Sequence, residues 1–164
     1  MGRMYTIPFN GTITAAGTDT DIWSFQAASN KPIKLRGFTL GQISEVGDSA
    51  EENLRITVKR MPATWTVGSG GNSVTAAASI NSSADTAWSF TARTNDTTVG
   101  TTSGTAQVLD EFGWNERNTP YEHWYPDERF CPESINGQGL VIRMETTLAD
   151  DMTFSGVAWV EEEG

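Results

Sequence analysis

The stretch that decides the fold is Leu35–Arg60, LRGFTLGQISEVGDSAEENLRITVKR. From Leu54 onwards, apolar residues alternate with polar ones, and this period of two is typical of a strand with one buried face. In the first half, Phe38 and Leu40 share a face in the same way. The residues between, 45–53, are acidic and contain glycine, so they are expected to lie in a loop. We therefore predict a long antiparallel β-hairpin within an all-β domain.

The same alternation recurs along the rest of the chain, with turn residues between the runs. Together with the hairpin these runs predict about eight to ten antiparallel strands and little or no helix, at the spacing of a sandwich or barrel. No internal repeat or linker interrupts residues 1–164, so we expect one domain, a jelly-roll or related Greek-key β-sandwich. The further strands are expected at Met4–Ile13, Asp21–Gln26, Thr86–Asn95, Thr105–Trp114, Tyr121–Tyr125, Gly139–Thr146 and Met152–Val160.

Charge and composition exclude several classes of protein. The net charge of −10 argues against nucleic-acid and anionic-membrane binding, which need clustered Lys and Arg, and favours a partner with a basic surface. The longest apolar run is only a few residues, so no transmembrane helix is expected, and the first residues lack the apolar core of a secretory signal. The single Cys131 excludes an internal disulfide framework.

Residues that could support catalysis or metal binding are sparse. His123 is the only histidine, so a catalytic triad or dyad would have to use it, yet no nucleophile motif accompanies it. A transition-metal site would need more His or Cys ligands than the chain has. We therefore predict that the protein is not an enzyme and holds no cofactor or metal.

Acidic residues leave two weaker alternatives open. Loop carboxylates could bind Ca²⁺ through Glu45, Asp48 and Glu51, although their spacing matches no known calcium loop. A glycosidase needs two facing carboxylates, and the chain offers Asp110, Glu111, Glu116 and Glu122. We interpret both sets as solvated charge.

The aromatic residues give the more interesting signal. Trp23, Trp88 and Trp159 lie in predicted strands, where tryptophan is more often part of the core. Because interface cores are enriched in Trp and Tyr, the aromatic residues in or beside loops are interface candidates. Covering the open end of the roll explains them equally well, and a sugar-stacking platform is a further alternative. The interface candidates are Trp65, Trp114, Trp124 and Tyr125.

The chain resembles a family of small proteins encoded among the head genes of tailed phages and prophages. The resemblance rests on structural motifs spread over nearly the whole chain, and the segment Tyr121–Cys131 matches least. These motifs are Tyr5-Thr6 and Phe9-Asn10-Gly11; Lys31-Pro32-Ile33, Leu35-Arg36-Gly37-Phe38 and Leu40-Gly41-Gln42; Glu45-Val46-Gly47-Asp48, Glu51-Glu52 and Leu54-Arg55-Ile56; 68–71 (GSGG), Ser73-Val74-Thr75, Phe154-Ser155-Gly156 and Val160-Glu161-Glu162.

The resemblance implies a jelly-roll decoration or cement protein, which binds the exterior of the phage capsid and stabilises the head. The implied partners are the major capsid protein and further copies of the chain in a homotrimer, assembled in the host cytoplasm. Many copies per particle would let individually weak contacts act together. The alternatives are another virion component, such as a head-fibre or tail-associated protein, and a carbohydrate-binding β-sandwich module.

Overall fold

The protein is a sandwich of two antiparallel sheets that share one core. The computed structural model describes residues 2–15, 19–44, 52–75, 78–80, 87–118 and 120–164. In this part of the chain there are twelve strands, one short 3₁₀ helix and no α-helix. The elements are β1 (Arg3–Ile13), β2 (Thr20–Gln26), β3 (Ile33–Gln42), β4 (Asn53–Met61), β5 (Asn72–Val74), β6 (Ala78–Ser79), β7 (Thr91–Asp96), β8 (Gln107–Asn115), β9 (Tyr121–Trp124), η1 (Glu128–Phe130), β10 (Glu133–Ser134), β11 (Gly139–Met144) and β12 (Met152–Glu162).

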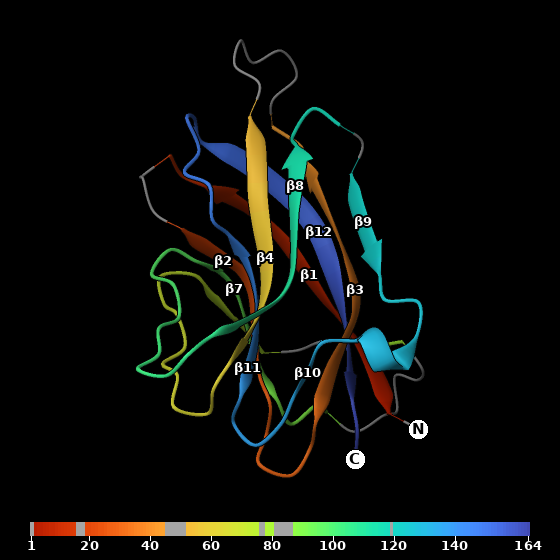
Figure 1. The fold of residues 1–164 in the computed structure, drawn as a ribbon. Coiled ribbons are helices and arrows are strands. Elements are labelled where there is room, and N and C mark those ends of the chain that lie inside the picture. The colour runs from red at the N-terminus through yellow and green to blue at the C-terminus, as the bar shows by residue number, and fades with distance from the viewer. Residues whose placement is uncertain (1, 16–18, 45–51, 76–77, 81–86, 119) are drawn as a thin grey trace.

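The strand order is that of a jelly roll, so the predicted fold class is confirmed. The first sheet, called sheet A, has the order β10-β3-β12-β1-β6, with β9 also paired to β3, and sheet B has the order β5-β7-β2-β11-β4-β8. In Figure 1, β4 and β8 of sheet B lie in front of β12, β1 and β3, and both termini lie at the lower end. The eight main strands β1, β2, β3, β4, β8, β9, β11 and β12 fall in sheets A, B, A, B, B, A, B and A.

The predicted hairpin between β3 and β4 is wrong. These two strands lie in different sheets: β3 pairs with β12, β9 and β10, whereas β4 pairs with β11 and β8. Alternation identifies the buried face of each strand, and Phe38, Leu40, Ile56 and Val58 are indeed fully buried. It does not identify the neighbouring strand, because a strand that crosses to the opposite sheet fills the same core with the same pattern.

The core between the sheets is rich in aromatic side chains. Trp23 is fully buried in sheet B, and its ring contacts Phe9 and Phe38 of sheet A with centroid distances of 5.7 and 6.2 Å. Its indole Nε1 donates a hydrogen bond of 3.1 Å to the carbonyl oxygen of Ile7. A single side chain thereby holds the two sheets together through ring contacts and a hydrogen bond.

Candidate functional site

The half of sheet A's outer face that lies away from η1 carries almost no charge, whereas the half near η1 carries Lys34, Arg36 and Glu161. The strands of this sheet alternate, so that one side chain enters the core and the next points outward, and their registers place the outward positions in neighbouring rows. We call the outward positions of the half away from η1 the neutral face, and Glu122 is the one charged residue among them. The neutral face consists of Thr6, Pro8, Asn10 and Thr12 on β1, Thr153, Ser155, Val157 and Trp159 on β12, Gly37, Thr39 and Gly41 on β3, and Glu122 and Trp124 on β9.

A pair of tryptophans lies at one side of the neutral face. The ring centroids of Trp124 and Trp159 are 4.3 Å apart, and Trp124 is 50% exposed. Between the two, in the same row, is Gly37. A Cβ atom at Gly37 would lie 2.8 Å from the Trp124 ring, so the missing side chain is what allows this ring to lie flat on the sheet. The indole Nε1 of Trp124 donates a hydrogen bond of 3.4 Å to Glu122.

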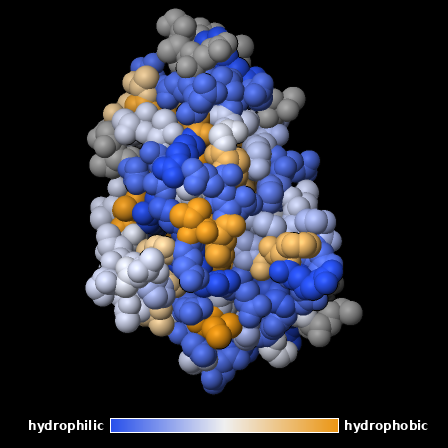
Figure 2. All heavy atoms as spheres, viewed as in Figure 1, coloured by the Kyte–Doolittle hydropathy of each residue, from blue (hydrophilic) through white to orange (hydrophobic). Residues whose placement is uncertain are grey.

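The outer face of sheet B has the opposite character. The Arg55 Nε atom lies 2.6 Å from the Glu111 carboxylate, and Glu145 accepts hydrogen bonds from Lys59 and, at 2.8 Å, from Thr57. Figure 2, which has sheet B in front, shows a mostly hydrophilic surface with small, separate hydrophobic islands. Ion pairs therefore run along the outer face of sheet B, whereas those of sheet A, such as Arg36–Glu161, lie at its η1 end rather than on the neutral face.

Acidification should weaken the ion pairs on the outer face of sheet B. Burial alone would raise the pKa of Glu145, but its hydrogen bonds from Lys59 and Thr57 and the charges of Lys59 and Arg143 hold this pKa below its ordinary value of 4.5. A lowered folded-state pKa stabilises the protein above the unfolded value, and this stabilisation is lost as the pH falls through the folded-state pKa.

We therefore expect the melting temperature to fall as the pH is lowered from 6 to below 4.5, and the fall to be smaller in Glu145→Gln. Thermal melts of both proteins at several pH values check this. Identical pH profiles for the variant and the wild type would contradict the assignment.

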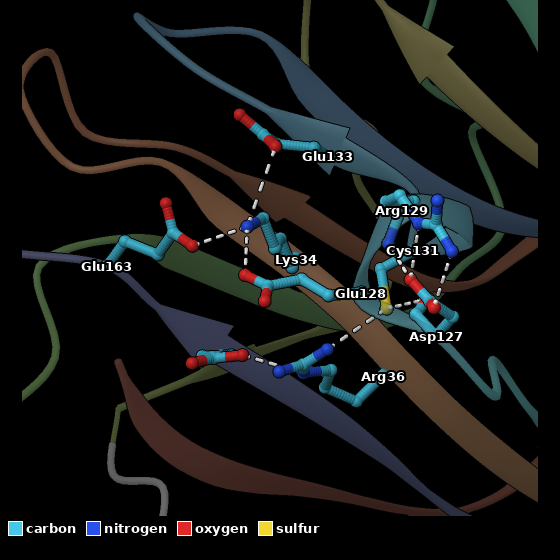
Figure 3. Close-up of polar contacts among 9 residues, drawn as sticks. Lys34, Arg36, Asp127, Glu128, Arg129, Cys131, Glu133 and Glu163 are labelled. Carbon is cyan, nitrogen blue, oxygen red and sulfur yellow. Dashed lines mark hydrogen bonds and ion pairs between the residues drawn. The ribbon is translucent and has the colours of Figure 1, made fainter. Parts of the chain in front are cut away.

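A cluster of charged side chains lies at the η1 end of sheet A (Figure 3). Three glutamates surround the Lys34 ammonium: Glu128 at 2.7 Å, Glu133 at 3.9 Å, and Glu163 in direct contact. Next to it, Arg36 pairs with Glu161 at 2.6 Å and donates a 3.3 Å hydrogen bond to the Cys131 sulfur. A hollow of about 500 Å³ is lined by Lys34, Arg60, Asp127, Glu128, Arg129, Cys131 and Glu133.

Phe130 stands out beside this charged cluster. It is the last residue of η1, and 66% of its surface is exposed. The neighbouring Asp127 caps η1 by accepting a hydrogen bond from the Arg129 backbone nitrogen, and its carboxylate also pairs with the Arg129 side chain at 3.0 Å. The short helix that carries this exposed aromatic residue therefore also carries charged residues of both signs.

His123 belongs to a hydrogen-bonded network that closes the side of the sandwich. Its Nδ1 lies 3.2 Å from the Tyr121 hydroxyl, and its Nε2 lies 3.1 Å from the Asp110 carboxylate. Asp110 also accepts a 3.2 Å hydrogen bond from Tyr125, while the Phe112 ring stacks on Tyr121 with a centroid distance of 3.9 Å. Since Asp110 and Phe112 lie on β8 and the others on or beside β9, the network joins the edges of the two sheets.

The other candidate carboxylates each have a separate partner. Glu111 pairs with Arg55, Glu122 accepts from the Trp124 indole, and Glu116 accepts from the backbone nitrogen of Glu52. The calcium candidates Glu45, Asp48 and Glu51 lie outside the described residues. Within the described ranges, no three His, Cys, Asp or Glu side chains are grouped so that they could hold a metal ion. The same part of the chain has no helix with the length and apolarity to cross a bilayer.

The four interface candidates occupy different environments. Trp65 and Trp114 are only 6% and 5% exposed in the single chain, so neither presents a large free surface. Trp65 packs on Gly139 over the outer face of sheet B, and its indole Nε1 donates to the Gly137 carbonyl at 3.1 Å.

Trp114 lies in β8 and joins the main core, where its ring is 6.3 Å from that of Phe154. Tyr125 is partly buried, with its hydroxyl committed to Asp110. Trp124 alone of the four presents a large exposed ring, and its interface role stays a prediction.

Sequence reasoning missed the partner of Trp124. Trp159 was expected in the core because it lies in a strand, yet it is only partly buried and points to the neutral face. The sequence does contain the signal. Side chains of a strand alternate between its two faces, and because Ala158 and Val160 point into the core, Trp159 between them must point outward.

Comparison of the chain with models of protein families, with curated proteins and with solved structures finds no match.

Proposed function

We propose that this protein acts by adhesion, as a decoration or cement protein on the exterior of a phage capsid. The observation that carries the proposal is the neutral face: a jelly roll with a net charge of −10 leaves half of one sheet's outer face almost free of charge, with a half-exposed tryptophan on it. A charge-poor surface with an exposed aromatic ring has the composition of an interface core. The sequence resemblance to head-gene proteins supplies the proposed partner, the major capsid protein, and the proposed trimer.

The η1 end is the proposed contact with the capsid. The strand cations Arg55 and Lys59 pair with glutamates of the same chain, so they are not proposed as the capsid contact. Phe130 offers a large exposed ring beside the mixed charges around Lys34. An aromatic ring bordered by both signs of charge can anchor in a pocket of a protein partner while the rim charges orient it.

The experiment is a sedimentation assay with purified heads that lack the protein. We expect saturable binding at a fixed ratio to the major capsid protein, and an apparent affinity about fivefold or more lower for Phe130→Ala, because an anchoring aromatic typically contributes more than 1 kcal/mol. Ile43→Ala is the matched control, since Ile43 is 57% exposed and lies at the opposite end of β3. Failure of the wild-type protein to bind heads would overturn the proposed function.

A carbohydrate-binding module is the second candidate. It is favoured by one observation, the half-exposed Trp124 ring with the Glu122 carboxylate at its indole nitrogen, because a sugar can stack on the ring and hydrogen-bond to the acid. A glycan array distinguishes the two candidates. Strong hits that disappear in Trp124→Ala would favour the carbohydrate module over decoration.

A further inference from the structure

We propose that the neutral face is where copies of this chain bind one another. The inference rests on the proposed function only for the number of copies, three. It assigns Trp124, Trp159 and their row neighbours to the contact between subunits and leaves the η1 end for the capsid.

The distribution of charge favours a second copy of this chain as the partner that binds the neutral face. Two copies that each carry a net charge of −10 repel one another, and the repulsion is strongest where acidic surfaces meet at less than the Debye length, about 8 Å at physiological salt. The neutral face lets two copies approach without setting acidic side chains against one another, since Glu122 is its one charged residue and lies on the edge strand β9. The charged residues Lys34, Arg36 and Glu161 lie further along the same side of the sheet, toward η1. A strongly basic partner would gain little from this face, because the face offers it almost no negative charge.

The shape and composition of the face also suit a protein contact. Gly37 and Gly41 have no side chain that projects from β3, and Thr39 and Val157 beside them are partly buried. The middle of the neutral face therefore has no long side chains. Trp124 and Trp159 supply the large apolar rings that dominate the binding energy of protein interfaces. Threonine and serine hydroxyls along β1 and β12 can hydrogen-bond across the contact without carrying charge.

The neutral face has two different sides, and a ring can form when one side of each copy binds the other side of the next copy. The tryptophan side of the face lies toward β9, and the Pro8 and Asn10 side lies on β1, next to the short strand β6 at the opposite edge of the sheet. If the β9 side of one copy packs against the β1 side of the next, the contact is heterologous, and such contacts form a ring when the rotation between copies closes. The number of copies, three, is taken from the proposed function.

Analytical ultracentrifugation of the full chain over a range of concentrations tests the inference. We expect the wild-type protein to sediment at three times the chain mass and its association to tighten as NaCl is raised from 50 to 500 mM, because salt screens the repulsion between acidic copies. Trp124→Ala should weaken association at least about tenfold, as expected when a large anchoring tryptophan ring is removed from an interface. Val157→Glu should give monomers by placing a charge in the centre of the face.

Phe130→Ala is the control and should associate like the wild type. Thermal melts establish that each variant is folded. A wild-type chain that stays monomeric at every salt concentration, or an association that salt weakens, would overturn the inference. So would association that is unchanged in both Trp124→Ala and Val157→Glu. A monomer that still binds heads would leave the proposed function intact, and a salt-tightened trimer that ignores heads would overturn only the function.

Discussion

Replacing Trp23 by alanine is expected to lower the free energy of unfolding by about 3–5 kcal/mol, the range for truncating a fully buried large aromatic. Trp23 is fully buried and contacts rings of the opposite sheet, and its indole donates to the Ile7 carbonyl across the core. The cavity would lie where the two sheets meet, and a rigid sandwich can close it only partly. Chemical denaturation at pH 7 measures the change.

Trp124→Ala is the matched control for this prediction, since it makes the same substitution at a half-exposed site. In dilute protein, Trp124→Ala should lower the free energy of unfolding far less than Trp23→Ala does. Equal losses for the two variants would contradict the view that Trp23 joins the sheets, and a loss below about 1 kcal/mol at Trp23 would show that this part of the core repacks freely.

Arg143→Met is expected to have an effect of similar size, about 3–5 kcal/mol at pH 7, because it leaves a buried carboxylate without its partner. Asp21 is fully buried, and Arg143 donates to its two carboxylate oxygens at 2.6 and 3.2 Å. Arg143 also donates to the Gly100 carbonyl at 2.8 Å, and the Gly100 nitrogen donates to Asp21 at 2.7 Å. The substitution therefore breaks a closed network that holds residue 100 on sheet B.

The pH dependence of this variant has a definite sign. Burial raises the pKa of Asp21 above its ordinary value of 3.8, against the lowering effect of the hydrogen bonds from Arg143 and Gly100. A group with a raised folded-state pKa stabilises the fold fully below the unfolded value, and this stabilisation is lost as the pH rises through the folded-state pKa. Without Arg143 the pKa of Asp21 is raised further. The stability of the variant should therefore be closer to that of the wild type near pH 4 than at pH 7.

The double variant Asp21→Asn/Arg143→Met separates charge from packing. It should recover part of the stability lost in Arg143→Met, because no uncompensated buried charge remains. A pH-independent loss in Arg143→Met, with no recovery in the double variant, would indicate that only packing is at stake.

How far the fold follows from the sequence is clearest at β3 and β4. Period-two alternation correctly predicts both strands and their buried sides, because each residue's burial depends on its own parity. The pairing of these strands depends on contacts far along the chain: β3 lies beside β12, more than a hundred residues away. The apolar pattern is the same for a hairpin and for a crossover to the opposite sheet, so no local signal distinguishes them.

For the candidate site, too, the individual residues can be predicted from the sequence, but their assembly into one surface cannot. Each strand's outward residues can be listed from the sequence, including Thr6 and Thr39. That these positions form one surface follows only from the registers that bring β1, β12, β3 and β9 together. Trp65 is a comparable case, since a tryptophan in a loop is expected at the surface until the structure packs it onto Gly139.

The measurement that tests the central claim most directly is electron cryomicroscopy of phage heads saturated with the protein. We predict jelly-roll density on the capsid exterior, grouped in threes, with the neutral face around Trp124 and Trp159 covered by neighbouring copies and η1 directed at the capsid. Heads that carry no such density, or density in which this face points uncovered into solvent, would contradict the account.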